Sequence, residues 1–358
     1  MPRAPLTLAV LLSAGLCLGA APAGSVETQL MAAGRKVVDA HPAKANAVLP
    51  GVGYTCMAAA ALVDTGDQSA RATAKAAADV VMRKLIGTRA SPRGWGYEGT
   101  ENCAGPGSSD AFGDGTCNAG DTAYAFQTGL AATCLARASV ATGDASYARV
   151  AQAVLTRWGR VADRPCPSCI QFQPSDSAND RGRAIRNTNT LMGMAAAWTF
   201  TATGDPEMRR LARGVAATEA REAAAGNVGY LSVADRDFKA NPQRQGQRLE
   251  NHYPFIAKGL LDIGVLTRDP RSRALGRRAM ADWMACRGAD CSKTPCTTWA
   301  AGPACAATAQ ALTPCFFRDD PEMAAACARV LAQKPRFSSY QVWVVADGRS
   351  PRFARRAR

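Results

Sequence analysis

The chain has 358 residues, a formal net charge of +14 and 13 cysteines. This length fits one large domain or two average ones and is enough to bury a core without help. The positive charge favours acidic partners such as uronate polysaccharides. The arginines are scattered without a nucleic-acid-binding motif, and no glycine-rich phosphate loop follows a strand, so nucleic-acid and nucleotide functions are disfavoured.

The N-terminal residues 1–23 predict a signal peptide. One positive charge precedes an apolar run over 6–18, and Ala21-Pro22-Ala23 follows as a cleavage pattern of small residues. This run is too short to span a bilayer, and no later segment is long enough. We therefore expect a secreted or periplasmic protein with no membrane span. Its single domain would cover 24–347, followed by a basic, solvated tail over 348–358.

Cysteine number predicts disulfides. Removing Cys17 with the leader leaves 12, an even number, and an oxidising compartment then favours up to six bridges. Spacing alone does not determine the connectivity, and the near neighbours that offer candidate pairs are Cys103 with Cys117, Cys166 with Cys169, and Cys286 with Cys291. The Cys166-Pro167-Ser168-Cys169 motif lies in a proline-rich loop rather than at a helix start after a strand. It therefore predicts a structural disulfide rather than a redox or zinc site.

Helical hairpins with a common hinge recur along the chain. The hairpins cover 51–85, 121–158, 187–220 and 250–286, and their hinges lie at 65–67, 142–144, 203–205 and 268–269, with a fifth hinge at 318–320. The first three hinges read Thr-Gly-Asp. Glycine supplies the left-handed residue that ends a helix, and aspartate caps the next one. Pro206, Pro270 and Pro321 follow at the first helical position, where a missing N–H costs nothing.

The two helices of each hairpin differ in character. The first is apolar nearly all round, which predicts burial, and the second carries charges on one face, which predicts an outer position. A helix over 26–40 precedes the first hairpin and would close the ring with the segment 338–346. No run of alternating strands is present. The prediction is an all-α fold, an (α/α) toroid or incomplete barrel of five to six hairpins, stapled by disulfides.

These features resemble the α/α-toroid superfamily of six-hairpin glycosidases and related polysaccharide lyases. The resemblance covers most of the mature chain. It rests on the repeated hinges and on phrases such as Asp121-Thr-Ala-Tyr124-Ala-Phe-Gln127-Thr-Gly, which precedes the Ala-Thr-Gly-Asp hinge. It implies a toroid that acts on carbohydrate. A complete catalytic motif of one family is not met.

The loops predict where chemistry takes place. The loops returning to the inner helices are long, at 87–120, 160–186, 222–249 and 287–298, and long loops in compact domains are usually functional. All should emerge on one face, at the inner-helix N-termini, whose free N–H groups suit anionic groups. The first turns there hold Tyr54, Asp121, Tyr124, Gln127, Arg186, Asn187, Asn189, Glu250, Asn251, His252 and Tyr253.

The first long loop adds aromatic candidates. Trp95 and Tyr97 would stack on sugar rings beside the carboxylate of Glu98, or would simply pack within a glycine-rich turn. The stretch 105–120, with Asp110 and Asp114, offers oxygen ligands for calcium, but its spacing fits no EF-hand and a disulfide-tied loop is favoured. We expect no cofactor and no other metal site.

Three functions remain open. A glycoside hydrolase needs two carboxylates, drawn from Glu98, Asp121 and Glu250, although Asp121 is equally well a helix N-cap. A polysaccharide lyase needs a neutralised uronate, a base and an acid. The lyase set that the resemblance implies is Asn187, Asn189 or Asn251 with Arg186, and His252 with Tyr253 or Tyr124. The third function is a non-catalytic toroid that binds glycan or protein.

We expect a secreted carbohydrate-active enzyme that cleaves a polysaccharide, preferably an anionic one. Oligomeric state is not indicated.

Overall fold

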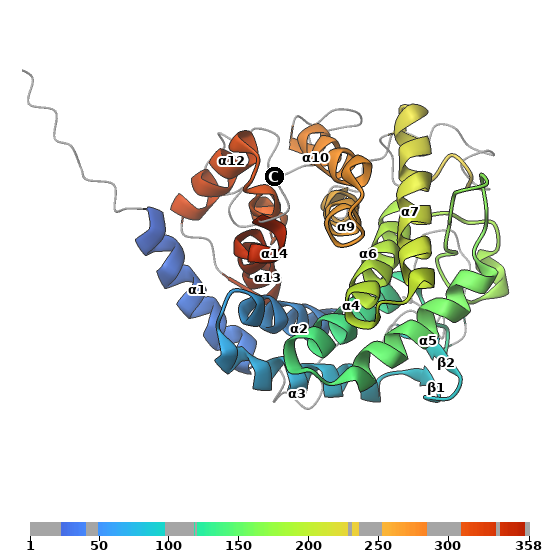
Figure 1. Cartoon of the computed structure of the whole chain (residues 1–358), viewed down its shortest axis with the longest axis horizontal. Helices are drawn as coiled ribbons and strands as arrows, with labels where there is room; N and C mark the ends of the chain where they lie inside the picture. The colour runs from blue at the N-terminus through green and yellow to red at the C-terminus, as the bar shows by residue number, and fades with distance from the viewer. Residues whose placement is uncertain are drawn as a thin grey trace, which may run out of the picture.

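The structure is a computed structural model that describes residues 23–40, 49–96, 118, 120–227, 231–235, 253–284, 309–333 and 337–354. Helices alternate along the chain between an inner and an outer ring (Figure 1). The inner elements are α2 (Leu49–Asp64), α4 (Ala125–Thr142), α6 (Arg186–Thr203), α9 (Tyr253–Leu266), the 3-10 helix η5 (Ala309–Phe317) and α13 (Ser339–Arg349). The outer helices are α1 (Ala23–Ala40), α3 (Arg71–Arg83), α5 (Ala145–Val161), α7 (Pro206–Ala224), α10 (Pro270–Met284) and α12 (Pro321–Ala332).

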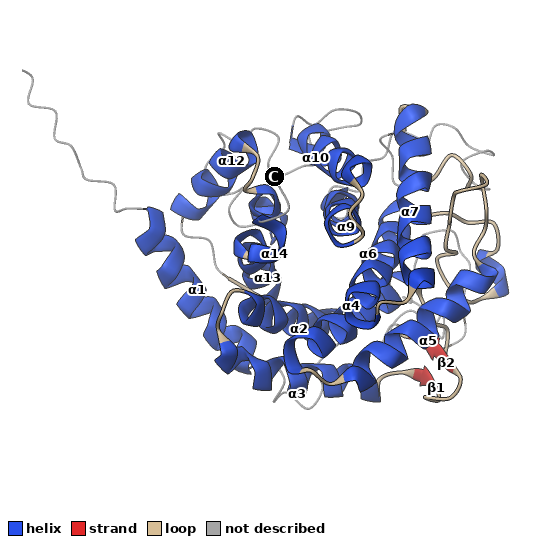
Figure 2. Cartoon of the chain, in the orientation of Figure 1, coloured by secondary structure: helices blue, strands red, loops and turns tan. Residues whose placement is uncertain are grey.

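The remaining described elements are short. They are η1 (Gln68–Ala70), η2 (Ala178–Asp180), α14 (Pro351–Ala354) and the antiparallel pair β1 (Ile86–Gly87) and β2 (Pro92–Gly94). Figure 2 shows how little strand accompanies the helices. The predicted α/α toroid is therefore confirmed.

The inner ring closes on itself. Each inner helix from α2 to α9 packs on the next, and α13 packs against both α2 and η5. The closing contact includes a buried hydrogen bond of 2.7 Å between the hydroxyls of Thr55 and Ser339. On the outside, Glu27 of α1 accepts from Arg318 at 3.2 Å and pairs with Arg349 at 2.9 Å. The predicted closure of the ring by the C-terminal segment is confirmed.

The hinges have the predicted chemistry. Gly143 and Gly204 are left-handed, with φ of 81° and 74°, and each ends an inner helix. The next residue is an aspartate whose carboxylate accepts a backbone N–H of the outer helix at 2.9 Å, both at Asp144 and at Asp205. In the fourth hinge the left-handed position is taken by Arg268, with φ of 56°.

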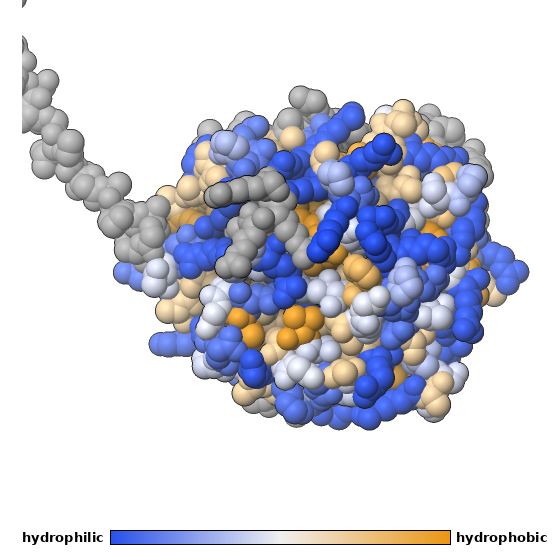
Figure 3. Space-filling view, viewed as in Figure 1, coloured by the Kyte–Doolittle hydropathy of each residue, from blue (hydrophilic) through white to orange (hydrophobic). Residues whose placement is uncertain are grey.

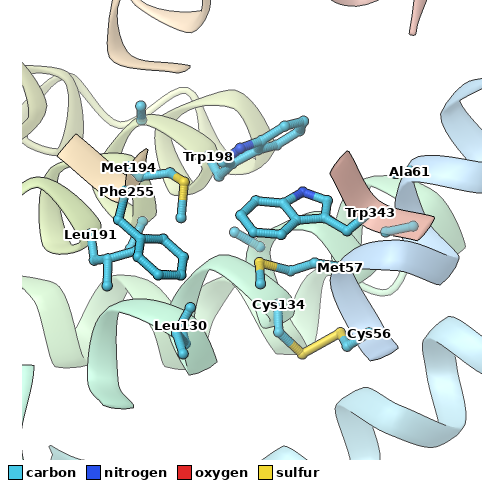
Figure 4. Close-up of a cluster of buried hydrophobic side chains, with 14 of the residues drawn as sticks. Cys56, Met57, Ala61, Leu130, Cys134, Leu191, Met194, Trp198, Phe255 and Trp343 are labelled. Atoms are coloured by element: carbon cyan, nitrogen blue, oxygen red, sulfur yellow. A yellow bond between two sulfur atoms is a disulfide. The ribbon is translucent and has the colours of Figure 1, made fainter. Parts of the chain in front are cut away.

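The core is built mostly from small side chains, so the inner helices approach closely. A Cβ added to Gly259 of α9 would lie 2.7 Å from the carbonyl oxygen of Thr190 on α6. Figure 4 shows larger side chains such as Met57, Leu191 and Trp343, from three inner helices, turned toward one another. These side chains are excluded from solvent, so the centre of the ring is a packed core rather than a pore.

Three disulfides connect described residues. Cys56–Cys134 joins α2 to α4, and Cys315–Cys327 joins η5 to α12. Cys166–Cys169 closes a loop of its own, with its Cα atoms 4.9 Å apart, as the sequence predicted. The other two candidate pairs, of Cys103 with Cys117 and of Cys286 with Cys291, lie outside the described residues.

A buried ion network crosses the ring axis, toward the C-terminal ends of the inner helices. Asp347 of α13 accepts from Arg137 of α4 at 2.7 Å and lies 3.1 Å from the ammonium of Lys258 on α9. Lys258 also donates to Asp262, which accepts the indole N–H of Trp198 at 2.8 Å. We call Arg137, Lys258, Asp262 and Asp347 the axial ion cluster, and all four are almost fully buried.

Aromatic rings surround the cations of the axial ion cluster. The Arg137 guanidinium lies 4.3 Å from the ring centre of Trp198, and the Lys258 ammonium lies 4.6 Å from those of Phe316 and Phe353. Two acids and two bases make the cluster neutral overall, which lowers the cost of removing its charges from water.

The segment expected as a basic tail belongs in part to the domain. Residues 348–354 continue through the end of α13 and form α14. Phe353 is buried, and Arg352 donates to Asp64 at 3.2 Å. Packing of Phe353 against Trp198 and Lys258 explains why this arginine-rich segment is ordered rather than solvated.

The described surface is hydrophilic. The face drawn in Figure 3 is covered mainly by polar residues, with small, separate apolar spots. Among the described residues, the large apolar side chains that are clearly exposed are Val37 and Val161. None of the described helices is long and apolar enough to cross a bilayer.

Candidate functional site

The loops entering the inner helices form a layer held by backbone hydrogen bonds. Tyr124, just before α4, donates its N–H to the carbonyl of Trp95 at 2.9 Å and forms a bridge with Ser175. In the next hairpin, Ile185 lies just before α6 and forms an equivalent antiparallel backbone bridge with Leu231. The predicted gathering of the long loops at the inner-helix N-termini is thus confirmed for their described parts.

Two aspartates fix this layer to the helix starts. Asp176 accepts the backbone N–H of Ala123 at 2.9 Å, and Asp235 accepts that of Ala184 at 2.6 Å. Each N–H lies two residues before an inner helix and has no partner within it, so the aspartates replace missing backbone partners.

A cluster of charges lies on the rim of the loop layer. Arg93 donates to Asp176 at 2.8 Å and to Asp121 at 2.6 Å, and we call these three residues the rim cluster. The Asp121 side chain is 70% exposed. The neighbouring Arg93 guanidinium lowers the pKa of Asp121, so this carboxylate is ionised at neutral pH. It therefore suits the role of a base, a nucleophile or a charge stabiliser, but not that of an acid.

Asp121 is not a helix cap. The residue in the N-cap position of α4 is Tyr124, whose backbone is extended and whose side chain makes no capping bond. The interpretation of Asp121 as an N-cap was wrong by three residues. The reason is that the chain crosses the loop layer between Asp121 and the first helical residue.

Aromatic side chains from the N-terminal halves of four inner helices meet inside the inner ring. Tyr54 of α2 lies 6.4 Å from Phe255 of α9 in a stacked arrangement and 5.3 Å from Tyr340 of α13 edge-to-face. Phe126 of α4 meets Phe255 at 5.8 Å. Tyr54 and Phe126 are only partly buried, so this aromatic floor, made by Tyr54, Phe126, Phe255 and Tyr340, has an accessible side.

Tyr340 was not among the sequence candidates. Burial raises the pKa of its hydroxyl to about 12, and the hydroxyl lies 3.3 Å from that of Thr313. It is therefore neutral at physiological pH. It begins the last inner helix, so the rule that nominated the first turns of the earlier helices would also have nominated Tyr340.

Two amides near the aromatic floor have buried polar atoms without a hydrogen-bond partner among the described residues. Both polar atoms of the Gln127 amide on α4, and the Oδ1 atom of Asn187 on α6, are buried and unpartnered. Both residues lie in the first turn of adjacent inner helices. A buried unsatisfied polar group costs about 1–3 kcal/mol, which a ligand or an ordered water would recover. These two amides remain candidates for ligand contact.

Three of the predicted contact residues have structural roles instead. Trp95 is fully buried and donates its indole N–H to Val81 at 2.8 Å, so it cannot stack on a sugar. The Asn189 amide is occupied by the backbone of Phe172 and Ile170, at 3.0 and 3.2 Å. Tyr124 is 3% exposed. The loop layer buries all three, and for Trp95 this is the packed alternative that the sequence left open.

Arg186 is engaged by an outer helix. Its guanidinium binds Glu219 of α7, at 2.8 Å from Nη2, and donates to the carbonyl of Asn227 at 2.9 Å. Both ionic side chains are buried. Arg186 is thus held toward α7, a position that sequence reasoning did not anticipate because Glu219 lies in the following helix.

Several candidates lie outside the described residues: Tyr97, Glu98, Asp110, Asp114, Glu250, Asn251 and His252. Tyr253 is the first residue of α9. Within the described ranges, no three His, Cys, Asp or Glu side chains are grouped as metal ligands would be.

Basic grooves adjoin the rim cluster. A cavity of about 580 Å³ is lined by Asp176, Arg157 and Arg160, among others. A second, of about 540 Å³, shares Arg157 and Arg160 and adds Arg149. In the described part of the chain neither Arg157 nor Arg160 forms an ion pair with a carboxylate. We call the two cavities together the basic groove, because their shared residues make them continuous along α5.

Solved structures share this fold. Cellobiose 2-epimerase from Spirochaeta thermophila superposes with a TM-score of 0.61 at 12% identity, over 93% of this chain and 96% of that one. A family GH76 α-mannanase from Bacteroides thetaiotaomicron gives 0.53 at 10% identity, over 95% and 98%. The chain therefore has the six-hairpin glycosidase-like toroid, a fold shared with carbohydrate-active enzymes.

An unsaturated glucuronyl hydrolase from Bacillus sp. GL1 is a more partial match. It has a TM-score of 0.46 and 18% identity, over 67% of this chain. The chain spans only 62% of the length of that hydrolase. No family model and no curated protein matches the chain.

Proposed function

We propose that this protein is a secreted glycoside hydrolase that cleaves an anionic polysaccharide at the loop-bearing face of the toroid. The observation that carries the proposal is the aromatic floor, accessible at Tyr54 and Phe126, with the ionised Asp121 on the rim of the same face. Aromatic faces bind the C–H faces of sugar rings, and a hydrolase needs an ionised carboxylate opposite an acid.

The hydrolase is favoured over the lyase because several residues of the lyase set are not accessible to a substrate. Tyr124 and Asn189 are buried in structural roles, and Arg186 is paired with Glu219. A lyase would therefore have to rely on Asn187 or Asn251 and on Tyr253, with an Arg186 whose charge is already balanced by Glu219. The hydrolase needs only Asp121 and one acid, for which Glu98 and Glu250 are the candidates.

An anionic substrate is supported by the basic groove. Arg157 and Arg160 are exposed, and the cavity that they line reaches Asp176 of the rim cluster. A line of like charges beside a site attracts a polymer of opposite charge. Secretion is supported by the leader sequence and by the disulfides, which persist in oxidising compartments. The carbohydrate activities of other toroids agree, although fold alone does not determine function.

The test is a polymer screen with the oxidised protein, reading reducing ends and the ultraviolet absorbance of unsaturated uronates. We expect reducing ends without that absorbance. Asp121→Asn should lower kcat by about 100-fold or more, because the ionised carboxylate is lost. His252→Ala should retain turnover. Asp163→Asn removes an exposed carboxylate from the same loop layer and serves as the matched control.

The other outcomes are equally clear. Unsaturated product together with inactivity of His252→Ala would replace the hydrolase by a lyase. Binding of polymers without any product would identify a non-catalytic glycan-binding toroid.

A second expected result concerns the basic groove. Arg157→Gln combined with Arg160→Gln should raise KM for an anionic polymer by about 3- to 10-fold at low salt, since each exposed charge pair contributes about 0–1 kcal/mol. The difference from wild type should shrink as salt screens the charges. The comparison is Arg71→Gln with Arg83→Gln, which removes the same charge from α3. If both double variants raised KM equally, the effect would come from net charge alone, and the basic groove would no longer be part of the proposal.

A further inference from the structure

A separate pocket lies between the third and fourth hairpins. Its volume is about 190 Å³, and its walls come from α6, α7, α9 and α10. The polar residues in the walls include Arg186, Glu219, Arg278 and Asp282. None of the residues of the aromatic floor or the rim cluster is among the described residues that line it. We call it the side pocket.

Glu219 lines the side pocket, and one of its carboxylate oxygens has no hydrogen-bond partner among the described residues. The carboxyl group is fully buried, and its Oε2 atom accepts from Arg186 at 2.8 and 3.1 Å. The Oε1 atom is buried without a hydrogen-bond partner. Burial raises the pKa of Glu219 although Arg186 acts in the opposite direction. The group is therefore suited to exchange hydrogen bonds with a hydroxyl, as acceptor or as donor.

The charges of the side pocket balance. Glu219 and Arg186 form one pair, and Asp282 lies 3.7 Å from Arg278 to form another. Among the described residues that line the pocket, two acidic and two basic side chains balance, so their charge selects neither an anion nor a cation. A neutral ligand with several hydroxyls would use both the guanidinium donors and the carboxylate acceptors.

The remaining walls are apolar. Ile256, Leu260 and Leu275 come from α9 and α10. A sugar ring combines apolar C–H faces with a polar edge, which matches a pocket of apolar walls and a few directed polar groups. The volume is below the roughly 300–1,000 Å³ typical of drug-sized ligands, so the pocket admits one small unit rather than a chain.

We propose that the side pocket is a second binding site, which takes a single neutral sugar unit and hydrogen-bonds it through the free oxygen of Glu219. This site goes beyond the catalytic function proposed above and holds whether that function is hydrolysis or elimination. It lies between two hairpins, whereas the aromatic floor lies inside the inner ring, so the two sites are separable by mutation.

The test is saturation-transfer NMR of the full chain with D-glucose, D-mannose and D-galactose, titrated to obtain Kd. At least one sugar should bind saturably. Ala223→Trp, at a half-buried position of the pocket wall, should weaken binding at least 10-fold by filling the space. Glu219→Gln keeps the shape but replaces the free oxygen, and should weaken binding about 3- to 10-fold, because one hydrogen bond contributes about 0.5–1.5 kcal/mol.

Tyr54→Ala separates this site from the aromatic floor, because it should leave the Kd of the bound sugar within about twofold. Circular dichroism would confirm that each variant is folded. The proposal is overturned if none of the three sugars binds. It is also overturned if binding survives Ala223→Trp, or if Tyr54→Ala abolishes it.

Discussion

Asp347→Ala is expected to destabilise the protein by about 3–5 kcal/mol, enough to abolish folding at moderate temperature, because it leaves buried cations without their counter-charge. Asp347 holds Arg137 by hydrogen bonds and lies 3.1 Å from Lys258. It also accepts the indole N–H of Trp343 at 2.8 Å. These partners come from α4, α9 and α13, so one substitution affects half of the inner ring. Urea unfolding followed by circular dichroism would measure the loss.

The matched control is an exposed ion pair. Arg210→Gln removes one partner of the Arg210–Glu207 pair, whose side chains are 52% and 40% exposed, and should change stability by at most about 1 kcal/mol. If Asp347→Ala costs no more than Arg210→Gln, the axial ion cluster is not what stabilises the ring.

The same carboxylate implies a pH dependence. Burial would raise the pKa of Asp347, but Arg137 and Lys258 outweigh it and hold the pKa below the ordinary value of 3.8. A lowered pKa in the folded state means that the stabilisation is present above the unfolded value and is lost as pH falls through the folded one. Acid unfolding should therefore begin below about pH 4.

Loss of the Cys56–Cys134 disulfide is the second large effect that we expect. Cys56→Ala with Cys134→Ala should cost about 4 kcal/mol, because the bridge spans 78 residues and strongly restricts the unfolded chain. Both sulfurs are also buried, so their removal leaves voids between α2 and α4. Urea unfolding of the oxidised proteins would measure this cost.

Cys166→Ala with Cys169→Ala is the comparison. That bridge spans three residues, and the same loop-entropy relation gives about 1–2 kcal/mol. Equal losses in the two double variants would contradict an explanation based on loop length.

The sequence predicts the ring well because its hinges are local. Thr-Gly-Asp encodes a left-handed turn and a cap within three residues, and the hinges ending at Asp144 and Asp205 form as expected. The inner and outer assignment follows from which helices lack a charged face. The axial ion cluster was missed because its members, such as Arg137 and Asp347, are 210 residues apart. A lone arginine inside an otherwise apolar helix was the available signal.

The candidate site was less predictable, because its layer is made of loops. Placement of the first turns of α4 and α6 on one face follows from helix direction. Which side chains stay accessible depends on how the loops cross them. Asn189 looks available in the sequence, yet the backbone of Phe172 and Ile170 occupies its amide. Trp95 takes the packed position that the sequence left open as its alternative. Glu219 was missed because it belongs to an outer helix, where a carboxylate is expected to face water.

The ring closure has a consequence for the order of folding. Glu27, near the start of α1, binds Arg318 and Arg349, which are made some 300 residues later. During synthesis, the sides of α1 and α2 that pack against α13 in the finished ring have no partner until α13 has been made. Their apolar surface stays exposed during that time. Contacts of such long sequence separation form late, because the entropy of closing the chain is lost before they form. The seam between the two ends is thus the last part of the toroid to assemble, and the interval before it closes is when an unfinished chain is most prone to aggregate.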